Sequence, residues 1–263
     1  MKKKILYFSA TGNSLHIARE LAKQLEDVSL VPINAQTVRQ QHEVPEFVGF
    51  VYPVYFCGLP KLVREFIPSL DINPTTYVFS ISTFAGSDYL SHQQIDQLLA
   101  SKQAKISYHA AIIMPGTYQL MYDTATPAKQ QKLFTQARQN INTIAGEIMA
   151  GNEKPVKPRQ GILAKLLNAY YHKYYCNPGG KDYNFYATSA CVHCGLCARV
   201  CPVNNILMQE GKPAWQGHCQ LCLACLHWCP SKAIQYRKKT VKRRRYHHPE
   251  VVAADIMPHT ALE

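Results

Sequence analysis

The sequence lacks any long apolar run, although 47% of its 263 residues are hydrophobic. Nowhere do about 18 apolar residues follow one another, which excludes a transmembrane helix and therefore integral contact with a membrane. The apolar run near the N-terminus is also short, because it ends before Ser9, Thr11 and Asn13, so we expect no secretory signal. These absences predict a globular protein of the cytoplasm.

Several enzyme motifs are also missing. The sequence has no H-E-x-x-H motif, no recognisable Ser-His-Asp set and no second glycine-rich nucleotide loop besides the one described below. These absences argue against a hydrolase and against a built-in NAD(P)H site.

Acidic residues are scarce. The chain carries 17 Asp and Glu against 29 Lys and Arg, a formal net charge of +12. The excess is uneven, with 13 basic against 11 acidic residues in residues 1–150 and 16 against 6 in residues 151–263. This asymmetry predicts two domains and suits the C-terminal part to an acidic partner, an anionic surface or nucleic acid.

Cysteine, in contrast, is abundant, and eight of the ten cysteines form two runs of the pattern C-x-x-C-x-x-C-x-x-x-C-P. The second run repeats the first at a constant offset of 28 residues, and Ile206 and Ile234 repeat beyond the prolines, which indicates a duplicated unit. In a reducing compartment such thiols are metal ligands rather than disulfides. Zinc sites usually use two separated pairs of ligands, so closely spaced thiolates favour 4Fe-4S clusters over structural zinc, which is the alternative.

Residues 187–237 resemble the bacterial two-cluster ferredoxins through these two runs. In that family the fourth cysteine of each run ligates the other cluster. The resemblance therefore implies two 4Fe-4S clusters with crossed ligand sets. One set is Cys191, Cys194, Cys197 and Cys229, and the other is Cys219, Cys222, Cys225 and Cys201.

The N-terminal half begins with the pattern of a strand, a polar loop and a helix. Residues 2–8 predict a strand, the loop SATGNS follows it, and apolar residues from Leu15 to Leu25 recur at helical spacing. The N-terminus of such a helix attracts an anion, and nearby hydroxyl groups and Gly12 suit a phosphate. Taken alone, the loop is also compatible with simple helix capping.

Further predicted strands alternate with predicted helices along residues 1–150, which indicates a doubly wound parallel sheet with its ligand site at the carboxyl ends of the strands. The strands are expected at residues 28–33, 47–55, 77–82 and 106–114, and the helices near 60–69, 89–103 and 128–150.

This half resembles the flavodoxins, and its loop matches their S-x-T-G-x-S motif for the phosphate of FMN. The resemblance implies that two later loops contact the flavin ring. For each aromatic residue in them, core packing is the alternative to stacking on the ring, and Tyr55 and Phe84 are the favoured stacking candidates. The implied cofactor-binding residues are Ser9, Thr11, Gly12, Asn13, Ser14, Pro53, Tyr55, Phe56, Gly58, Thr83, Phe84, Ala85 and Gly86. Residues 114–127 resemble an insertion, from which Tyr118 could reach the ring.

Two segments flank the cysteine unit. Residues 151–186 form a predicted linker with a short helix, which we expect to pack against a domain rather than lie on a membrane. Residues 238–263 form a predicted basic C-terminal tail, introduced by RKKTVKRRR at residues 237–245. Such a run is usually solvated, with an acidic redox partner or nucleic acid as the alternative ligands.

The sequence therefore predicts an α/β protein in which a flavodoxin-like doubly wound parallel sheet precedes a small α+β two-cluster ferredoxin domain. This order resembles that of the bacterial and archaeal fusions called ferrodoxins. The resemblance implies an electron carrier that relays electrons between FMN and the clusters. The basic charge of the C-terminal part indicates that its redox partner proteins are acidic. The alternatives are an FMN-dependent reductase of a small substrate, with Tyr55, Tyr118 or His109 as proton donor, and, less favoured, a redox-sensing nucleic-acid-binding protein.

Overall fold

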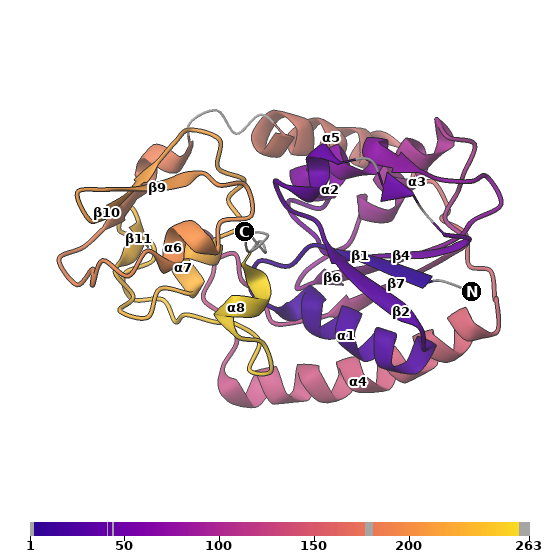
Figure 1. Ribbon diagram of the computed structural model, residues 1–263, viewed down its shortest axis with the longest axis horizontal. Coiled ribbons are helices and arrows are strands. Elements are labelled where there is room, and N and C mark those ends of the chain that lie inside the picture. The colour runs from indigo at the N-terminus through magenta and orange to yellow at the C-terminus, as the bar shows by residue number, and fades with distance from the viewer. Residues whose placement is uncertain (1–2, 41, 44, 177–180, 258–263) are drawn as a thin grey trace.

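The computed structural model describes residues 3–40, 42–43, 45–176 and 181–257. Figure 1 shows two units side by side: a sheet flanked by helices, built from the N-terminal half, and a smaller unit of short strands and helices from the C-terminal part. The domain boundaries expected at residues 150, 186 and 237 stay predictions.

Five parallel strands form the central sheet in the order β2-β1-β4-β6-β7. Counted along the chain, this is the 2-1-3-4-5 order of flavodoxin-like doubly wound sheets, so the predicted fold class is confirmed. The strands are β1 (Lys3–Tyr7), β2 (Val28–Pro32), β4 (Phe47–Pro53), β6 (Tyr77–Phe84) and β7 (Tyr108–Ile113), and a separate short pair joins β3 (His42–Glu43) to β5 (Leu70–Asp71).

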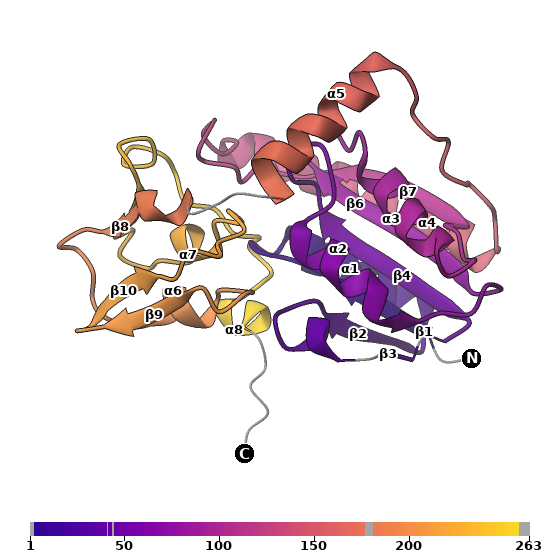
Figure 2. The ribbon, with the colours of Figure 1, turned by 90° about the horizontal axis from the view of Figure 1, so that it is seen from above.

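Helices cover both faces of this sheet (Figure 2). On one face lie α1 (Asn13–Leu25) and α4 (Pro127–Met149), and on the other lie α2 (Lys61–Phe66) and α3 (Ser91–Ala100). Three short 3-10 turns are η1 (Thr37–Arg39), η2 (Ile67–Ser69) and η4 (Lys181–Asn184).

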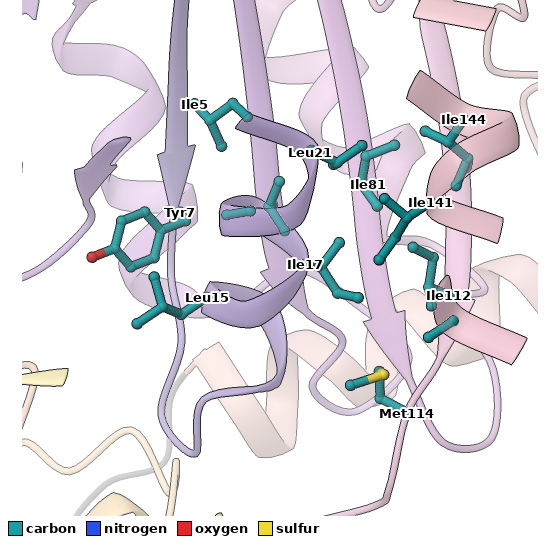
Figure 3. Packing of buried hydrophobic residues seen from close by; sticks show 14 of the residues in the cluster. Ile5, Tyr7, Leu15, Ile17, Leu21, Ile81, Ile112, Met114, Ile141 and Ile144 are labelled. Carbon is teal, nitrogen blue, oxygen red and sulfur yellow. The ribbon is translucent and has the colours of Figure 1, made fainter. Parts of the chain in front are cut away.

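Successive side chains of β1 enter different cores. Ile5 belongs to the core formed with α1 and α4, in which Figure 3 shows Leu21 near Ile5 and Ile141 near Ile112, whereas Leu6 belongs to the core formed with α2 and α3. Because both faces of a parallel sheet are buried, its strands read as continuous apolar runs. This explains why the sequence located all five strands of the sheet.

The smaller unit contains two antiparallel strand pairs. In one, β8 (Phe185–Ala187) pairs with β11 (Ile234–Tyr236), and in the other, β9 (Ile206–Gln209) pairs with β10 (Lys212–Trp215). Two one-turn helices complete it, α6 (Leu196–Arg199) and α7 (Ala224–His227).

The backbone of this unit repeats itself with the 28-residue offset of the cysteines. Helix α7 follows α6 by 28 residues, and β11 starts 28 residues after β9. Positive φ angles recur at the same offset, in the pairs His193 and Leu221, Gly195 and Leu223, and Asn204 and Lys232. The duplication indicated by the cysteine spacing is therefore a duplication of loop, helix and strand.

The linker contains α5 (Ile162–Tyr171), which continues as a π-helical turn, η3 (His172–Cys176). Ala164 and Tyr171 of α5 are buried, and the Tyr171 hydroxyl donates a hydrogen bond to the carbonyl oxygen of Leu59. Ile162 and Leu166 are exposed. The helix therefore packs on the sheet domain along one side only.

The chain after β11 returns to the sheet domain and ends, within the described residues, at α8 (Ala253–Ile256) beside α1 (Figure 1). There Asp255 accepts two hydrogen bonds from Arg19, at 2.7 and 3.1 Å. Three residues of the basic run also bind protein: Arg243 and Arg244 donate to carbonyl oxygens of residues 119–124, and Arg245 donates to the carbonyl oxygen of Ile234. The guanidinium groups of residues 243–245 thus form hydrogen bonds within the chain.

Candidate functional site

The loop between β1 and α1 is shaped as a helix N-terminal anion site. Gly12 has a φ of 94°, and its N–H donates to the Ser9 hydroxyl at 3.1 Å, immediately before α1 begins at Asn13. The hydroxyl groups of Ser14 and Thr83 lie 2.8 Å apart, which ties the loop to the end of β6. Free N–H groups and hydroxyls at this helix start provide donors for a phosphate.

A cavity of about 380 Å³ opens at the carboxyl ends of the strands. Its volume lies in the range of cofactor sites, roughly 300–1,000 Å³. Of the thirteen residues predicted to bind FMN, eleven line it: Ser9, Thr11, Asn13, Ser14, Pro53, Tyr55, Phe56, Thr83, Phe84, Ala85 and Gly86. The sequence therefore located three separate loops that meet in space.

The remaining two predicted residues, Gly12 and Gly58, do not line the cavity. A Cβ on Gly12 would lie 2.9 Å from Val251 and 3.0 Å from His248. A Cβ on Gly58 would lie 2.6 Å from the Tyr171 ring. Each glycine allows another part of the protein to pack closely against its backbone. Gly12 and Gly58 therefore support the cavity without lining it.

Aromatic side chains form much of the cavity wall. The ring of Phe56 is stacked on Tyr175 at 5.2 Å and meets Tyr118 edge-on at 5.1 Å. Phe56 and Cys57 both have positive φ, in a tight turn closed by paired hydrogen bonds between Tyr55 and Gly58. Strained turns of this kind concentrate at ligand sites.

The segment after β7 contributes more residues to the cavity than Tyr118, the one residue predicted from the sequence. Besides Tyr118, the cavity is lined by Met114, Pro115, Gly116, Thr117, Met121 and Tyr122. Asn13 holds this segment by donating from its amide to the Pro115 carbonyl at 3.0 Å. Insertions have no periodic pattern, so their contacts could not be read from the sequence.

His109 does not line this cavity. It lies instead in a second cavity with His92 and Lys154, and its ring nitrogen is 2.7 Å from the Lys154 carbonyl oxygen. Its selection as a proton donor at the flavin is therefore wrong. His109 lies on β7, whereas the cavity is lined by residues that follow that strand, from Met114 onward.

The cysteine unit supplies one wall of the first cavity, which the sequence did not predict. Leu221, Cys222 and Leu223 line it, and the first and last of these have positive φ. The buried Trp228 of the same unit donates from its indole N–H to the Ala10 carbonyl at 2.9 Å. The predicted phosphate loop and the second cysteine run thus line one cavity.

Backbone N–H groups point at cysteine sulfur atoms in both runs. Asn205 N–H donates to Cys201 Sγ and Ala233 N–H to Cys229 Sγ, each at 3.2 Å and at equivalent positions of the repeat. Such hydrogen bonds stabilise thiolates and tune the potentials of iron-sulfur clusters. The donor set and its surroundings therefore fit cluster ligation.

The thiols influence one another across the two runs. Burial, and then the neighbouring Cys229, Cys194 and Cys191, raise the pKa of Cys197 to about 11. Burial likewise raises the pKa of Cys219 to about 12, with Cys201 adding to the rise. These neighbours are the members of the two crossed ligand sets, which stay a prediction.

The family described as the 4Fe-4S binding domain matches residues 186–207. This range contains the first run, Cys191, Cys194, Cys197 and Cys201. At least one 4Fe-4S cluster is thereby supported.

Solved structures similar to this chain include flavodoxins. The flavodoxin of Streptococcus pneumonia TIGR4 is 15% identical, covers 56% of this chain and 99% of its own, and has a TM-score of 0.37. The flavodoxin of Megasphaera elsdenii is 16% identical, covers 52% of this chain and 98% of its own, and has a TM-score of 0.33. At these values the fold assignment rests on the strand order of the sheet.

No curated protein matches the sequence. Among the described residues, no helix combines the length and the apolar character needed to cross a bilayer.

Proposed function

We propose that this chain is an electron-transfer flavo-iron-sulfur protein that holds FMN and two 4Fe-4S clusters, of the kind called ferrodoxins. One observation carries the proposal: the predicted flavin loops and the cysteine loop 221–223 line a single cavity. Electron transfer needs its cofactors close together, and a shared wall brings them close without a mobile carrier.

The phosphate of FMN would be held by the start of α1 and the hydroxyls of Ser9, Thr11 and Ser14. The ring would lie among Tyr55, Phe84 and the segment after β7. Bound FMN supplies chemistry in both one- and two-electron steps, whereas each cluster handles one electron at a time. The residues around the cavity, Cys222 among them, would hold the ring against the cysteine unit.

The alternative of an FMN-dependent reductase is supported by the size of the cavity and its aromatic lining. Tyr55 and Tyr118 both line the cavity and are the proton donors in that case, although burial raises the pKa of each well above the ordinary value. Nucleic acid binding has less support, because Arg243, Arg244 and Arg245 already donate to protein carbonyl groups. The redox partners we propose are acidic proteins of the cytoplasm.

The test is an anaerobic purification followed by an ultraviolet-visible spectrum and assays of iron, sulfide and flavin on the same sample. We expect about eight iron and eight sulfide per chain with one FMN, as two 4Fe-4S clusters require. A colourless protein that contains zinc would overturn the proposal.

The phosphate loop is tested by the double variant Thr11→Ala with Ser14→Ala. It should retain at least tenfold less FMN after dialysis, because two hydroxyl donors to a charged group are removed, at about 1.5–3 kcal/mol each. The matched control is Ser101→Ala, whose exposed hydroxyl donates only to the Leu98 carbonyl. Equal flavin retention in both variants would exclude this loop as the phosphate site.

A further inference from the structure

The two copies of the duplicated unit have different surroundings. The second copy packs against the sheet domain, through Gln220, which accepts from Leu62 N–H at 3.1 Å, and His227, which lies 2.8 Å from the Thr117 carbonyl oxygen. Both residues are buried. This copy therefore serves as the docking face for the flavin site.

The equivalent positions of the first copy face solvent. Val192 corresponds to Gln220 and is 61% exposed, and Arg199 corresponds to His227 and is also exposed. Cys194 corresponds to Cys222 and is exposed, whereas Cys222 lines the cavity. At these three positions the first copy is open where the second copy packs inside the molecule, whereas Val200, which corresponds to Trp228, is buried in the core of the sheet domain.

We infer that the two clusters act in a fixed order, and this inference rests on the proposed function. The inner cluster, held by the set that contains Cys222, exchanges electrons with the flavin. The outer cluster, held by the set that contains Cys194, exchanges them with an external partner that docks over residues 191–194. This partner is an acidic protein that carries one electron at a time.

The charge around the outer cluster specifies the partner. Arg199 donates to the Cys194 carbonyl at 3.1 Å, and Lys232 closes a turn on the Cys229 carbonyl. The side chains of Arg199, Lys232 and Lys212 are all exposed. Lys212 lies on the neighbouring hairpin β9–β10, whose one acidic residue is Glu210. A surface rich in basic residues beside an electron entry point attracts an acidic protein and speeds its association.

When the flavin is reduced, each partner molecule gives up one electron to the outer cluster, and the inner cluster passes it on. Two such events supply the electron pair for full reduction of the flavin, and water supplies the protons. In the opposite direction, the reduced flavin passes two electrons along the same path to two oxidised partner molecules, one electron to each.

The docking surface is tested with the cofactor-loaded protein and a reduced acidic two-cluster bacterial ferredoxin as the probe. Stopped-flow absorbance follows flavin reduction over a series of salt concentrations. The variant Arg199→Glu with Lys232→Glu should lower the rate at low salt by tenfold or more, because association between opposite charges is accelerated by about 10- to 1,000-fold. The matched control is Lys129→Glu with Lys132→Glu, on the exposed side of α4.

The control variant should react at the rate of the unaltered protein, and reduced methyl viologen should react equally with all three. Equal ferredoxin rates in the two charge variants would overturn the docking surface.

The order of the clusters is tested with Cys194→Ala. Electron paramagnetic resonance should show the loss of one cluster, with flavin content unchanged. Reduction of the flavin by ferredoxin should slow at least tenfold, whereas redox titration should still show the remaining cluster and the flavin in equilibrium. An unchanged ferredoxin rate would overturn the order. Absence of flavin or of clusters from the unaltered protein would instead overturn the proposed function.

Discussion

The indole N–H of Trp228 donates a 2.9 Å hydrogen bond to the carbonyl oxygen of Ala10, and both residues are buried. Trp228 precedes the last cysteine of the second run, and Ala10 lies in the predicted phosphate loop. The bond therefore joins the cysteine unit to the predicted phosphate loop.

Replacement of Trp228 by Phe should weaken both folding and flavin binding. The change removes the donor and leaves the Ala10 carbonyl buried without it, which costs about 1–3 kcal/mol. We expect the dissociation constant of FMN, measured by fluorescence titration, to rise about fivefold.

Trp215→Phe provides the control for this change. The Trp215 indole nitrogen is buried and has no hydrogen-bond partner among the described residues. Its removal should therefore leave FMN affinity unchanged. If both variants lost flavin equally, the Trp228 bond would have no special role in the site.

Gly12 provides a second prediction. Its φ of 94° disfavours any side chain, and an added Cβ would lie within 3.0 Å of His248 and Val251. Gly12→Ala should lower the free energy of unfolding, measured with urea, by about 1–3 kcal/mol. The contrasting change is Gly146→Ala at an exposed position of α4, where no atom lies within 4 Å of an added Cβ, and it should stabilise the protein by about 0.5–1 kcal/mol. Stabilisation by both changes would contradict the packing described for the C-terminal segment.

The sheet and the flavin loops could be predicted because their signals are local. Apolar runs such as FVGFVYP mark buried parallel strands, and loops that follow consecutive strands must meet at one edge of the sheet. The cysteine spacing likewise specifies its own unit. The loops that line the cavity could therefore be predicted without the structure, while their role in binding a cofactor stays a prediction.

The interface between the two units could not be predicted from the sequence, because it joins residues that are far apart in the chain. The second run has Leu221 and Leu223 where the first has His193 and Gly195, but this difference does not say which surface they meet, and only the second copy lines the cavity. The basic run similarly has the composition of a solvated tail, while in the fold Arg245 donates to the carbonyl oxygens of Thr240 and of Ile234 in β11. Such contacts depend on which surfaces the fold brings together.

His248 makes stability depend on pH. Burial, and then the adjacent His16, lower its pKa from 6.5 to about 3, and its ring is stacked on that of His16 at 3.9 Å. The folded state therefore keeps this imidazole neutral, while the unfolded chain takes up a proton below pH 6.5. Stability that is fully present above pH 6.5 should be lost as the pH falls toward 3, on the order of 1 kcal/mol by pH 5.5.

The measurement is urea unfolding between pH 7.5 and 5.5, with the variant His248→Gln compared to the unaltered protein. The variant should show a smaller loss over this range, because glutamine does not titrate. His247→Gln, at the exposed neighbouring residue, should retain the full loss. Identical pH dependence in all three proteins would show that His248 does not govern it.

The crossed ligand sets are tested by combining cysteine variants. Cys229 belongs to the second run by sequence, but it lies near Cys197 of the first. If Cys229 completes the outer cluster, Cys229→Ala and Cys194→Ala each remove the same cluster, and the double variant should keep about half of the iron, as either single variant does. Combining Cys229→Ala with Cys222→Ala should remove nearly all of it.

Uncrossed ligation gives the reverse result, because Cys229 and Cys222 would then share a cluster. Iron and sulfide assays on anaerobically purified proteins distinguish the two patterns. Cys57→Ala is the control, since this free thiol lines the flavin cavity but stands outside both runs. It should retain all of the iron, which would separate loss of a cluster ligand from general damage to the site.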